Sequence, residues 1–263
     1  MIYSLIFIVF ILIAFGFQTM QLMPKAKGIR VLMYHKVSND TADFLTVTTA
    51  QLENHLKHLQ NLDYQYVTTQ QVLDFYYFKK PLPPNPLLLT FDDGYLNNLE
   101  LAYPNLKKYK AKATLFIPSS FVGKHNAWDN GTDDIMNIEQ LQNLDPSVFE
   151  LALHSHKHTN FKNRTLIEIE EDMLLNIAFF KKNSLPFIPV LAYPYGGRPK
   201  GKDYEAMKKM FEKQGILAAF RIGNKVNAFN INDLYALKRI DIRGTDSFED
   251  FKKKMGKGRL RLV

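Results

Sequence analysis

Short apolar runs alternate with stretches of helical periodicity along most of the chain. The runs are bounded by Pro, Gly or polar residues, which is typical of strands buried on both faces of a parallel sheet. We predict strands at residues 29–35, 64–67, 87–93, 113–117, 148–154, 188–193, 217–221 and 237–242. We predict helices from residue 49, from residue 69, and at 95–109 (broken at Pro104), 138–144, 165–182 and 204–214. This order predicts a parallel α/β architecture, with a barrel and a doubly wound sheet both open at this point.

The amino terminus is the most hydrophobic part of the sequence. Residues 1–17 are almost wholly apolar, and no charged residue precedes Lys25. Extended to Met23, the segment reaches the length of about 20 residues that a spanning helix needs. We therefore predict a single-pass membrane anchor or signal-anchor at residues 1–23, which contacts membrane lipid, and one folded domain at 24–263. A cleaved signal peptide is the alternative, although the leading positive charges and a clear cleavage site are missing.

Composition and charge narrow the function classes. The chain has 263 residues, of which 46% are hydrophobic, so it can bury a large core. It has no cysteine, which excludes disulfides, thiolate metal ligands and a cysteine nucleophile. The net charge of +8 lies after the anchor, and six of the cations gather in residues 252–261. This end is either a solvated tail or a surface for anionic lipid or glycan. We predict no nucleic-acid partner because no recognition module accompanies the charge.

Four predicted strands end in residues that can carry chemistry. These ends are His35, the pair Asp92 and Asp93, the histidine cluster at 154–158, and the Tyr-Pro-Tyr-Gly-Gly loop at 193–197. Asp93 with the following glycine is, taken alone, also a plain turn signal. The carboxyl ends of parallel strands meet at one edge of a sheet or barrel, so we expect the four segments to converge there.

The histidine cluster offers two geometries. In an extended segment His154, His156 and His158 share one face, whereas a turn after His154 brings His154 and His158 together. Two imidazoles and one carboxylate suit a divalent metal with open positions for water and substrate. Zn²⁺ is the usual occupant of such a site, with Fe²⁺, Co²⁺ and Ni²⁺ as alternatives.

Two motifs together resemble a known family. The segment Thr90-Phe91-Asp92-Asp93-Gly94, followed by His154-Ser155-x-x-His158, is similar to the paired motifs of the polysaccharide deacetylases, the NodB-homology family 4 of carbohydrate esterases. The likeness extends from about residue 34 to residue 242. It implies a distorted (β/α)7 barrel.

The resemblance also implies residue roles. Asp93, His154 and His158 would bind the metal, while Asp92 would act as the general base. The backbone N–H of Tyr195, after Pro194, would help to hold the oxyanion. Taken alone, Pro194 to Gly197 is also an ordinary turn between a strand and a helix.

The sequence departs from the commoner family pattern at two places. Ala192 stands where an arginine usually holds the base, and no histidine follows His158 to act as the acid. His35 is similar to the acid histidine on the amino-terminal strand of a circularly permuted branch that includes poly-N-acetylglucosamine deacetylases, so we assign it as general acid. A buried structural histidine is the alternative. Arg239 could reach Asp92 from the last strand, although a Lys-Arg pair near a strand end is usually solvated.

The implied function is metal-dependent hydrolysis of N-acetyl groups of a polysaccharide or lipid-linked glycan, with release of acetate. The alternatives are an O-acetyl carbohydrate esterase and a catalytically silent carbohydrate-binding protein on the membrane. Trp128 could stack on sugar or pack back onto the barrel. A glycan substrate favours the cell-envelope side of the membrane, whereas Lys25, Lys27 and Arg30 favour the cytoplasmic face. The sequence does not indicate an oligomeric state.

Overall fold

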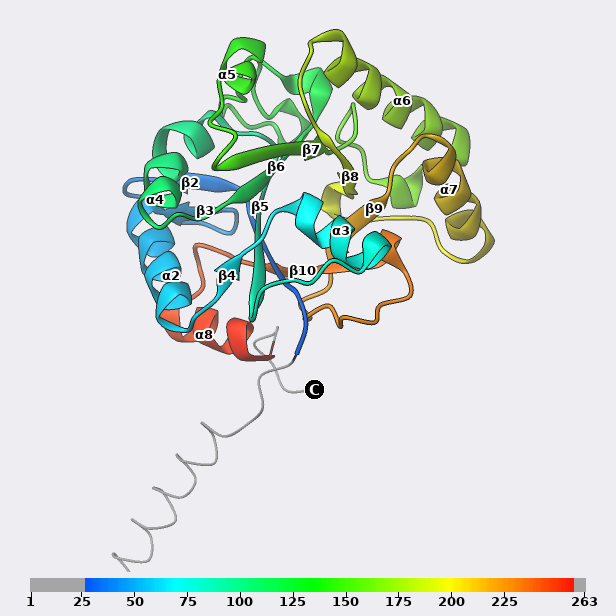
Figure 1. Cartoon of the computed structure of the whole chain (residues 1–263). Coiled ribbons are helices and arrows are strands. Elements are labelled where there is room, and N and C mark those ends of the chain that lie inside the picture. Colours follow the sequence, from blue (N-terminus) through cyan, green and yellow to red (C-terminus); the bar gives the residue numbers. More distant parts are fainter. Residues whose placement is uncertain (1–26, 258–263) are drawn as a thin grey trace, which may run out of the picture.

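The computed structural model describes residues 27–257 (Figure 1). The predicted anchor at 1–23 lies outside the described residues, so the membrane segment stays a prediction. Within 27–257, no helix is both long enough and apolar enough to cross a membrane.

Seven parallel strands form a closed barrel, so the doubly wound alternative is wrong. The strands are β1 (Arg30–Tyr34), β5 (Pro86–Asp92), β6 (Ala113–Ile117), β7 (Phe149–Leu153), β8 (Ile188–Ala192), β9 (Ala218–Ile222) and β10 (Leu237–Asp241). Their order is β1-β10-β9-β8-β7-β6-β5, and β1 also pairs with β5, which closes the barrel. The first strand of the barrel therefore lies between the last strand and β5. This position brings His35, which follows β1, next to the end of β5.

The alternation of side chains divides the core into two layers. One cluster fills the barrel, with Leu88, Phe116, Ala152, Val190 and Phe220 among its members. The helix α3 (Thr69–Phe78) packs against this cluster and covers the amino-terminal end of the barrel. The opposite carboxyl-terminal end is left to the functional residues.

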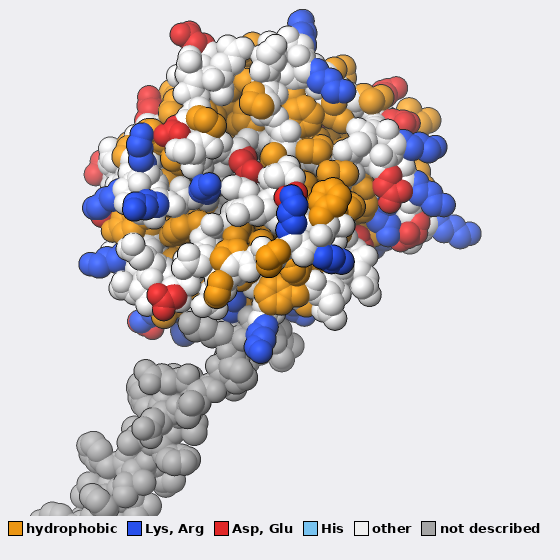
Figure 2. Space-filling view, in the orientation of Figure 1, with side chains coloured by type: hydrophobic (Ala, Val, Ile, Leu, Met, Phe, Trp, Pro, Cys, Tyr) orange, Lys and Arg blue, Asp and Glu red, His pale blue; other side chains and the backbone are white. Residues whose placement is uncertain are grey.

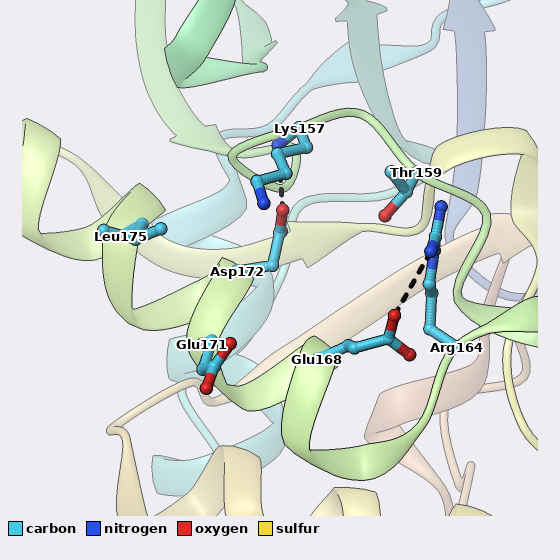
Figure 3. A pocket seen from close by; sticks show the side chains of 7 residues that line it. All are labelled: Lys157, Thr159, Arg164, Glu168, Glu171, Asp172 and Leu175. Carbon is cyan, nitrogen blue, oxygen red and sulfur yellow. Dashed lines mark hydrogen bonds and ion pairs between the residues drawn. The ribbon is translucent and has the colours of Figure 1, made fainter.

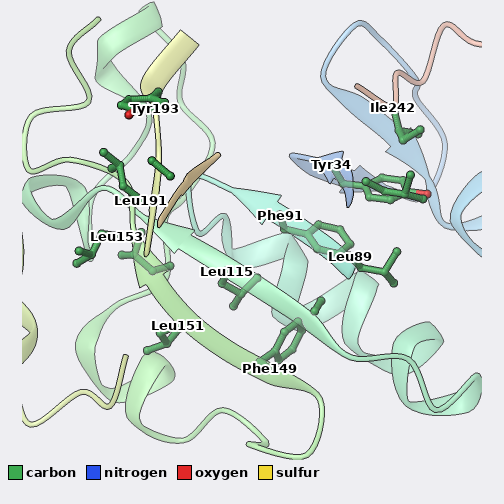
Figure 4. Close-up of a cluster of buried hydrophobic side chains, with 14 of the residues drawn as sticks. Tyr34, Leu89, Phe91, Leu115, Phe149, Leu151, Leu153, Leu191, Tyr193 and Ile242 are labelled. Carbon is green, nitrogen blue, oxygen red and sulfur yellow. The ribbon is translucent and has the colours of Figure 1, made fainter. Parts of the chain in front are cut away.

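The second cluster joins the outer face of the barrel to the surrounding helices (Figure 4). These helices are α2 (Thr49–Asn61), α4 (Tyr103–Lys108), α5 (Ile138–Gln142), α6 (Leu166–Lys182), α7 (Gly201–Lys213) and α8 (Phe248–Lys257). Reciprocal capping boxes begin α2 at Thr48 and α6 at Thr165. The cap of α2 is thus Thr48, and the helix begins at Thr49 as predicted.

Several local predictions were wrong. The segment between His35 and the helix from residue 49, where we predict no strand, contains β2 (Lys36–Ser38) and β3 (Thr46–Thr48), which pair with each other in parallel. The predicted strand at 64–67 is reduced to β4 (Gln65–Tyr66). The basic residues from 252 are not all a solvated tail. Those at 252–257 lie in α8. There Lys254 is buried and donates to the Asp241 backbone oxygen at 2.6 Å and to Asp246 Oδ2 at 2.5 Å.

The face that carries α3 is chemically mixed. It exposes the aromatic residues Tyr77 and Phe78, and Phe229 lies exposed near them, with its ring 5.6 Å from that of Phe75 in α3. Figure 2 shows hydrophobic side chains on this face interspersed with Lys and Arg.

Truncation inside the barrel should be costly. Leu88 is fully buried in β5, so Leu88→Ala is expected to lower the free energy of unfolding by about 2–5 kcal/mol. Leu174→Ala on α6, where the side chain is 51% exposed, is the matched control and should stay within about 0.5 kcal/mol of the parent. Urea unfolding of both variants measures the difference. Equal effects would contradict the described packing.

Candidate active site

The predicted strand ends converge on one cleft at the carboxyl edge of the barrel. The cleft has a volume of about 280 Å³. Eight of the nine predicted site residues line it: His35, Asp92, Asp93, Trp128, His154, His158, Tyr195 and Arg239. The ninth, Pro194, is buried directly beside Tyr195.

Asp93, His154 and His158 form a compact cluster. One ligand atom from each residue lies within 4.8 Å of the others, and all three residues are buried. Asp93 Oδ1 is 3.3 Å from His154 Nε2 and 3.1 Å from His158 Nε2. The chain therefore turns after His154, as one of the two predicted geometries requires. His156 points elsewhere, with Nδ1 2.9 Å from Ser119 Oγ.

The chemistry of these atoms fits a divalent metal. His154 Nδ1 lies 2.8 Å from the Ala192 carbonyl oxygen, so this nitrogen carries the proton and leaves Nε2 as a free electron-pair donor. Asp93 Oδ1 faces both imidazole nitrogens and makes no hydrogen bond of good geometry with any described residue. Burial works to raise the pKa of Asp93, but the facing imidazoles hold it well below its ordinary value. Two imidazole nitrogens and an ionised carboxylate are typical zinc ligands.

The backbone around this cluster is strained. Asp93, Ser155, His158 and Tyr195 all have φ between +52° and +73°, which L side chains rarely adopt. Gly94 follows Asp93 with φ +68°, and a Cβ there would lie 2.6 Å from Ile117 Cδ1. These sharp turns change the direction of the chain at the strand ends, so that Asp93 and His158 turn toward the same point. Such strain is concentrated at functional sites.

Helix α6 holds the loop between the two histidines. The carboxylate of Asp172 accepts a hydrogen bond from the backbone N–H of Lys157 at 2.8 Å (Figure 3). It also accepts from the backbone N–H of His156 at 2.8 Å. Asn176 donates to Ser119 Oγ at 2.8 Å and to the Ile117 carbonyl. The sequence does not reveal these supports, because Asp172 looks like any polar residue of an amphipathic helix.

Asp92 has different partners from its neighbour. Its two carboxylate oxygens accept from Arg239, with Oδ1 2.5 Å from Nη1 and Oδ2 2.7 Å from Nη2. His35 Nε2 lies 3.8 Å from Asp92 Oδ2, and His154 Nε2 lies 4.0 Å from it. Burial works to raise the pKa of Asp92, but the charge of Arg239, with His154 and His35, holds it below its ordinary value. Asp92 is therefore an ionised, buried acceptor, and Arg239 is buried rather than solvated.

Aromatic residues form the wall beside His158. The Trp128 ring lies 4.4 Å from the His158 ring and packs edge-on against Phe121 at 4.6 Å. The Tyr195 ring lies 5.0 Å from His158 and is 55% exposed. Trp128 thus packs back onto the protein and still lines the cleft.

A second group of cleft-lining residues was not predicted. It contains Phe44, Asp241 and Arg243, with the Arg243 guanidinium 4.0 Å from the centre of the Phe44 ring. Arg243 Nε donates to Asp241 Oδ2 at 2.6 Å. These residues lie outside the motifs, and Asp241 is placed by the pairing of β10 with β1, where it is the partner of Met33.

The fold and the site together define the class of protein. The sequence profile of the family described as "Polysaccharide deacetylase" matches residues 79–216. The chain belongs to the polysaccharide deacetylase family, whose enzyme class is that of hydrolases acting on carbon–nitrogen bonds other than peptide bonds. The matched range contains Asp92, Asp93, His154 and His158, but neither His35 nor Arg239.

Individual relatives agree with this family. A Staphylococcus aureus protein named "Poly-beta-1,6-N-acetyl-D-glucosamine N-deacetylase" is 30% identical over 234 residues, which cover 86% of this chain and 77% of that protein. The Bacillus subtilis protein YxkH is 28% identical over 194 residues, and the match covers 73% of this chain and 65% of YxkH. The structure of IcaB from Ammonifex degensii shares the fold with a TM-score of 0.73 at 21% identity, and the match covers 89% of this chain and 98% of that one.

The two adjacent carboxylates should differ in metal binding. We expect Asp93→Ala and His158→Ala to weaken Zn²⁺ binding at least about tenfold, because each removes a ligand. Asp92→Asn should keep the Zn²⁺ affinity within about threefold of the parent, because Asp92 pairs with Arg239 instead. Competition with a chelating fluorophore measures all three affinities. An equal loss in Asp92→Asn and Asp93→Ala would contradict the assignment.

Gly94 should be needed for two separable reasons. Gly94→Ala adds a methyl group against Ile117 Cδ1 and places a side chain at φ +68°, so we expect a loss of stability of about 1–3 kcal/mol and weaker Zn²⁺ binding. Adding Ile117→Val removes the contacting Cδ1 and should restore only part of the loss, because the backbone strain remains. Thermal unfolding of the single and double variants measures both parts, and full restoration would show that φ does not matter.

Proposed function

We propose that the protein hydrolyses N-acetyl groups of a polysaccharide and releases acetate, with a divalent metal held by Asp93, His154 and His158. The observation that carries this proposal is the separation of two adjacent carboxylates, one facing two imidazoles and the other held by an arginine. A metal bound at this cluster would polarise the acetyl carbonyl and favour ionisation of water.

Asp92 is the general base of the proposed reaction. It is ionised, it lies beside the metal ligands, and the two hydrogen bonds from Arg239 fix its carboxylate plane. An attacking water near His154 would transfer its proton to the free lone pairs of Asp92. Arg239, from the last strand, takes the role of the arginine that commoner family members carry at the position of Ala192. The Tyr195 backbone N–H, at the rim of the same cleft, would stabilise the oxyanion.

His35 is the proposed general acid. Its Nε2 lies 3.8 Å from Asp92 Oδ2 directly after β1, it lines the same cleft as Trp128 and Tyr195, and an amine leaving group needs a proton to depart. An O-acetyl esterase would need this proton less, because an alkoxide leaves more readily than an amide anion. The presence of His35 within 4 Å of the base therefore favours amide hydrolysis. A silent binding protein would not need the buried Asp92–Arg239 pair.

The substrate is proposed to be an N-acetylglucosamine polymer. The name of the Staphylococcus aureus relative specifies poly-β-1,6-N-acetylglucosamine, and that protein aligns with most of this chain. The cleft is lined by the exposed rings of Tyr195 and Phe44, which suit the apolar faces of sugar rings.

We also propose that residues 1–23 tether the enzyme to a membrane with the domain on the cell-envelope side. The described chain enters the barrel at the amino end of β1, whereas the cleft lies at the carboxyl ends of the strands. A tether at residue 27 would thus leave the cleft facing away from the membrane, toward a glycan outside it.

Acetate release tests the function directly. The full chain in detergent, loaded with Zn²⁺, should release acetate from β-1,6-linked N-acetylglucosamine oligomers. Asp92→Asn should lower kcat at least about 10²-fold while Zn²⁺ stays bound, because the base is lost. Release of acetate only from O-acetylated sugars would contradict the amidase assignment. Sugar binding without acetate release would support a binding protein instead.

A further inference from the structure

Two consecutive asparagines hold the backbone at His35 and just after it. Asn98 Nδ2 donates to the His35 carbonyl oxygen at 2.7 Å. Asn97 Oδ1 accepts from the Val37 backbone N–H at 3.0 Å. Asn98 Nδ2 also lies 3.2 Å from Asn97 Oδ1, so the two side chains are joined to each other. We call Asn97 and Asn98 the amide clamp.

The amide clamp contacts the chain beyond the last paired residues of β1 and β5. β1 and β5 pair from Arg30↔Leu87 to Tyr34↔Phe91, and this is the last pair. His35 and Asp92 come directly after it, so these two residues do not form a further register pair of β1 with β5. Beyond that point, the described contacts between the two segments include the clamp and the 3.8 Å approach of His35 to Asp92.

The clamp belongs to the same short segment as the base. Asp92, Asp93, Asn97 and Asn98 lie within seven consecutive residues. Asn98 is fully buried, and its backbone N–H donates to the Tyr95 carbonyl at 3.0 Å. It is also the first residue of a π-helical turn, Asn98–Ala102, which is a rare conformation often found at functional sites. A rigid segment thus connects the base to the backbone of His35.

We propose that Asn97 and Asn98 are positioning residues that set the placement of the His35 imidazole relative to Asp92 and the leaving amine. This inference rests on the proposed function, in which His35 is the acid. A displacement of about 1 Å in a reacting group can cost about 10²-fold in rate. Loss of the clamp should therefore slow the step in which His35 gives its proton, and leave the metal cluster intact.

Two substrates separate positioning from a general structural role. Amide hydrolysis of N-acetylglucosamine oligomers needs a proton on the leaving amine, whereas 4-nitrophenyl acetate releases a stable anion that needs none. For the Zn²⁺-loaded full chain, Asn98→Ala should lower kcat for the amide about tenfold or more, with KM and the rate on the ester within about twofold of the parent. Asn97→Ala, at a less buried position, should show the same selectivity with a smaller loss.

Two comparisons make the test specific. Asn227→Ala removes a similarly buried asparagine that bonds the backbone of Lys238, and neither residue lines the cleft, so any loss there should affect both substrates equally. In a His35→Ala background, adding Asn98→Ala should slow amide hydrolysis by less than about twofold, because the group it positions is absent.

The outcomes distinguish a failure of the proposed function from a failure of the positioning role alone. If the parent cleaves the ester but no N-acetyl sugar, the proposed function fails and the inference fails with it. If the parent is active and His35→Ala loses amide hydrolysis selectively, but Asn98→Ala lowers both rates equally or neither, only the inference is overturned. Independent, multiplicative effects of His35→Ala and Asn98→Ala would overturn it as well.

Discussion

The buried pair of Asp92 and Arg239 is the interaction on which the site depends. It joins the end of β5 to the last strand across the barrel and leaves both side chains almost inaccessible to water. Burying two charges is costly, and removing either partner of such a pair typically costs about 3–5 kcal/mol. The bidentate geometry offsets the cost and orients the carboxylate. With Asp92 held in this way, Asp93 makes the closest approaches to the imidazoles of His154 and His158, at 3.3 and 3.1 Å.

Closure of the barrel brings Asp92 and Arg239 within hydrogen-bonding distance of each other. β1 pairs with both β5 and β10, so the first and last strands of the barrel lie side by side and β1 also borders β5. His35 arrives from the first of these strands and Arg239 from the last. The residues outside the matched family range therefore complete a site whose other members lie inside it. The local order of the motifs in the chain matters less than the edge of the barrel at which their strands end.

The sequence was sufficient for the parts of the fold that repeat a simple pattern. Buried strands correspond to short apolar runs, and the residues predicted at their ends, such as Asp92 and His154, do meet in one cleft. Prediction from the sequence failed where hydrogen bonds between residues far apart in the chain determine the position of a side chain. Lys254 looked like part of a solvated tail, yet two acceptors bury it in α8. Nothing in the local pattern of Asp172 or Asn98 shows that each binds the backbone of a distant functional loop.

Strained backbone conformations and the hydrogen bonds that hold them occur in the same part of the site. Asp93 and His158 have left-handed backbone conformations, which the surrounding hydrogen bonds must hold in place. Asp172 does this for the histidine loop, and the amide clamp is proposed to hold the backbone at His35. Asp93 and His158 thus lie on turns beyond the strand ends, whereas Asp92 and Arg239 belong to β5 and β10.

The division of work between the two adjacent carboxylates is the central claim, and anomalous diffraction at the zinc edge from crystals of the Zn²⁺-loaded protein tests it most directly. The account predicts one ion bound by Asp93, His154 Nε2 and His158 Nε2, with Asp92 outside the coordination shell and still paired with Arg239. An ion coordinated by Asp92, with the arginine displaced, would contradict it.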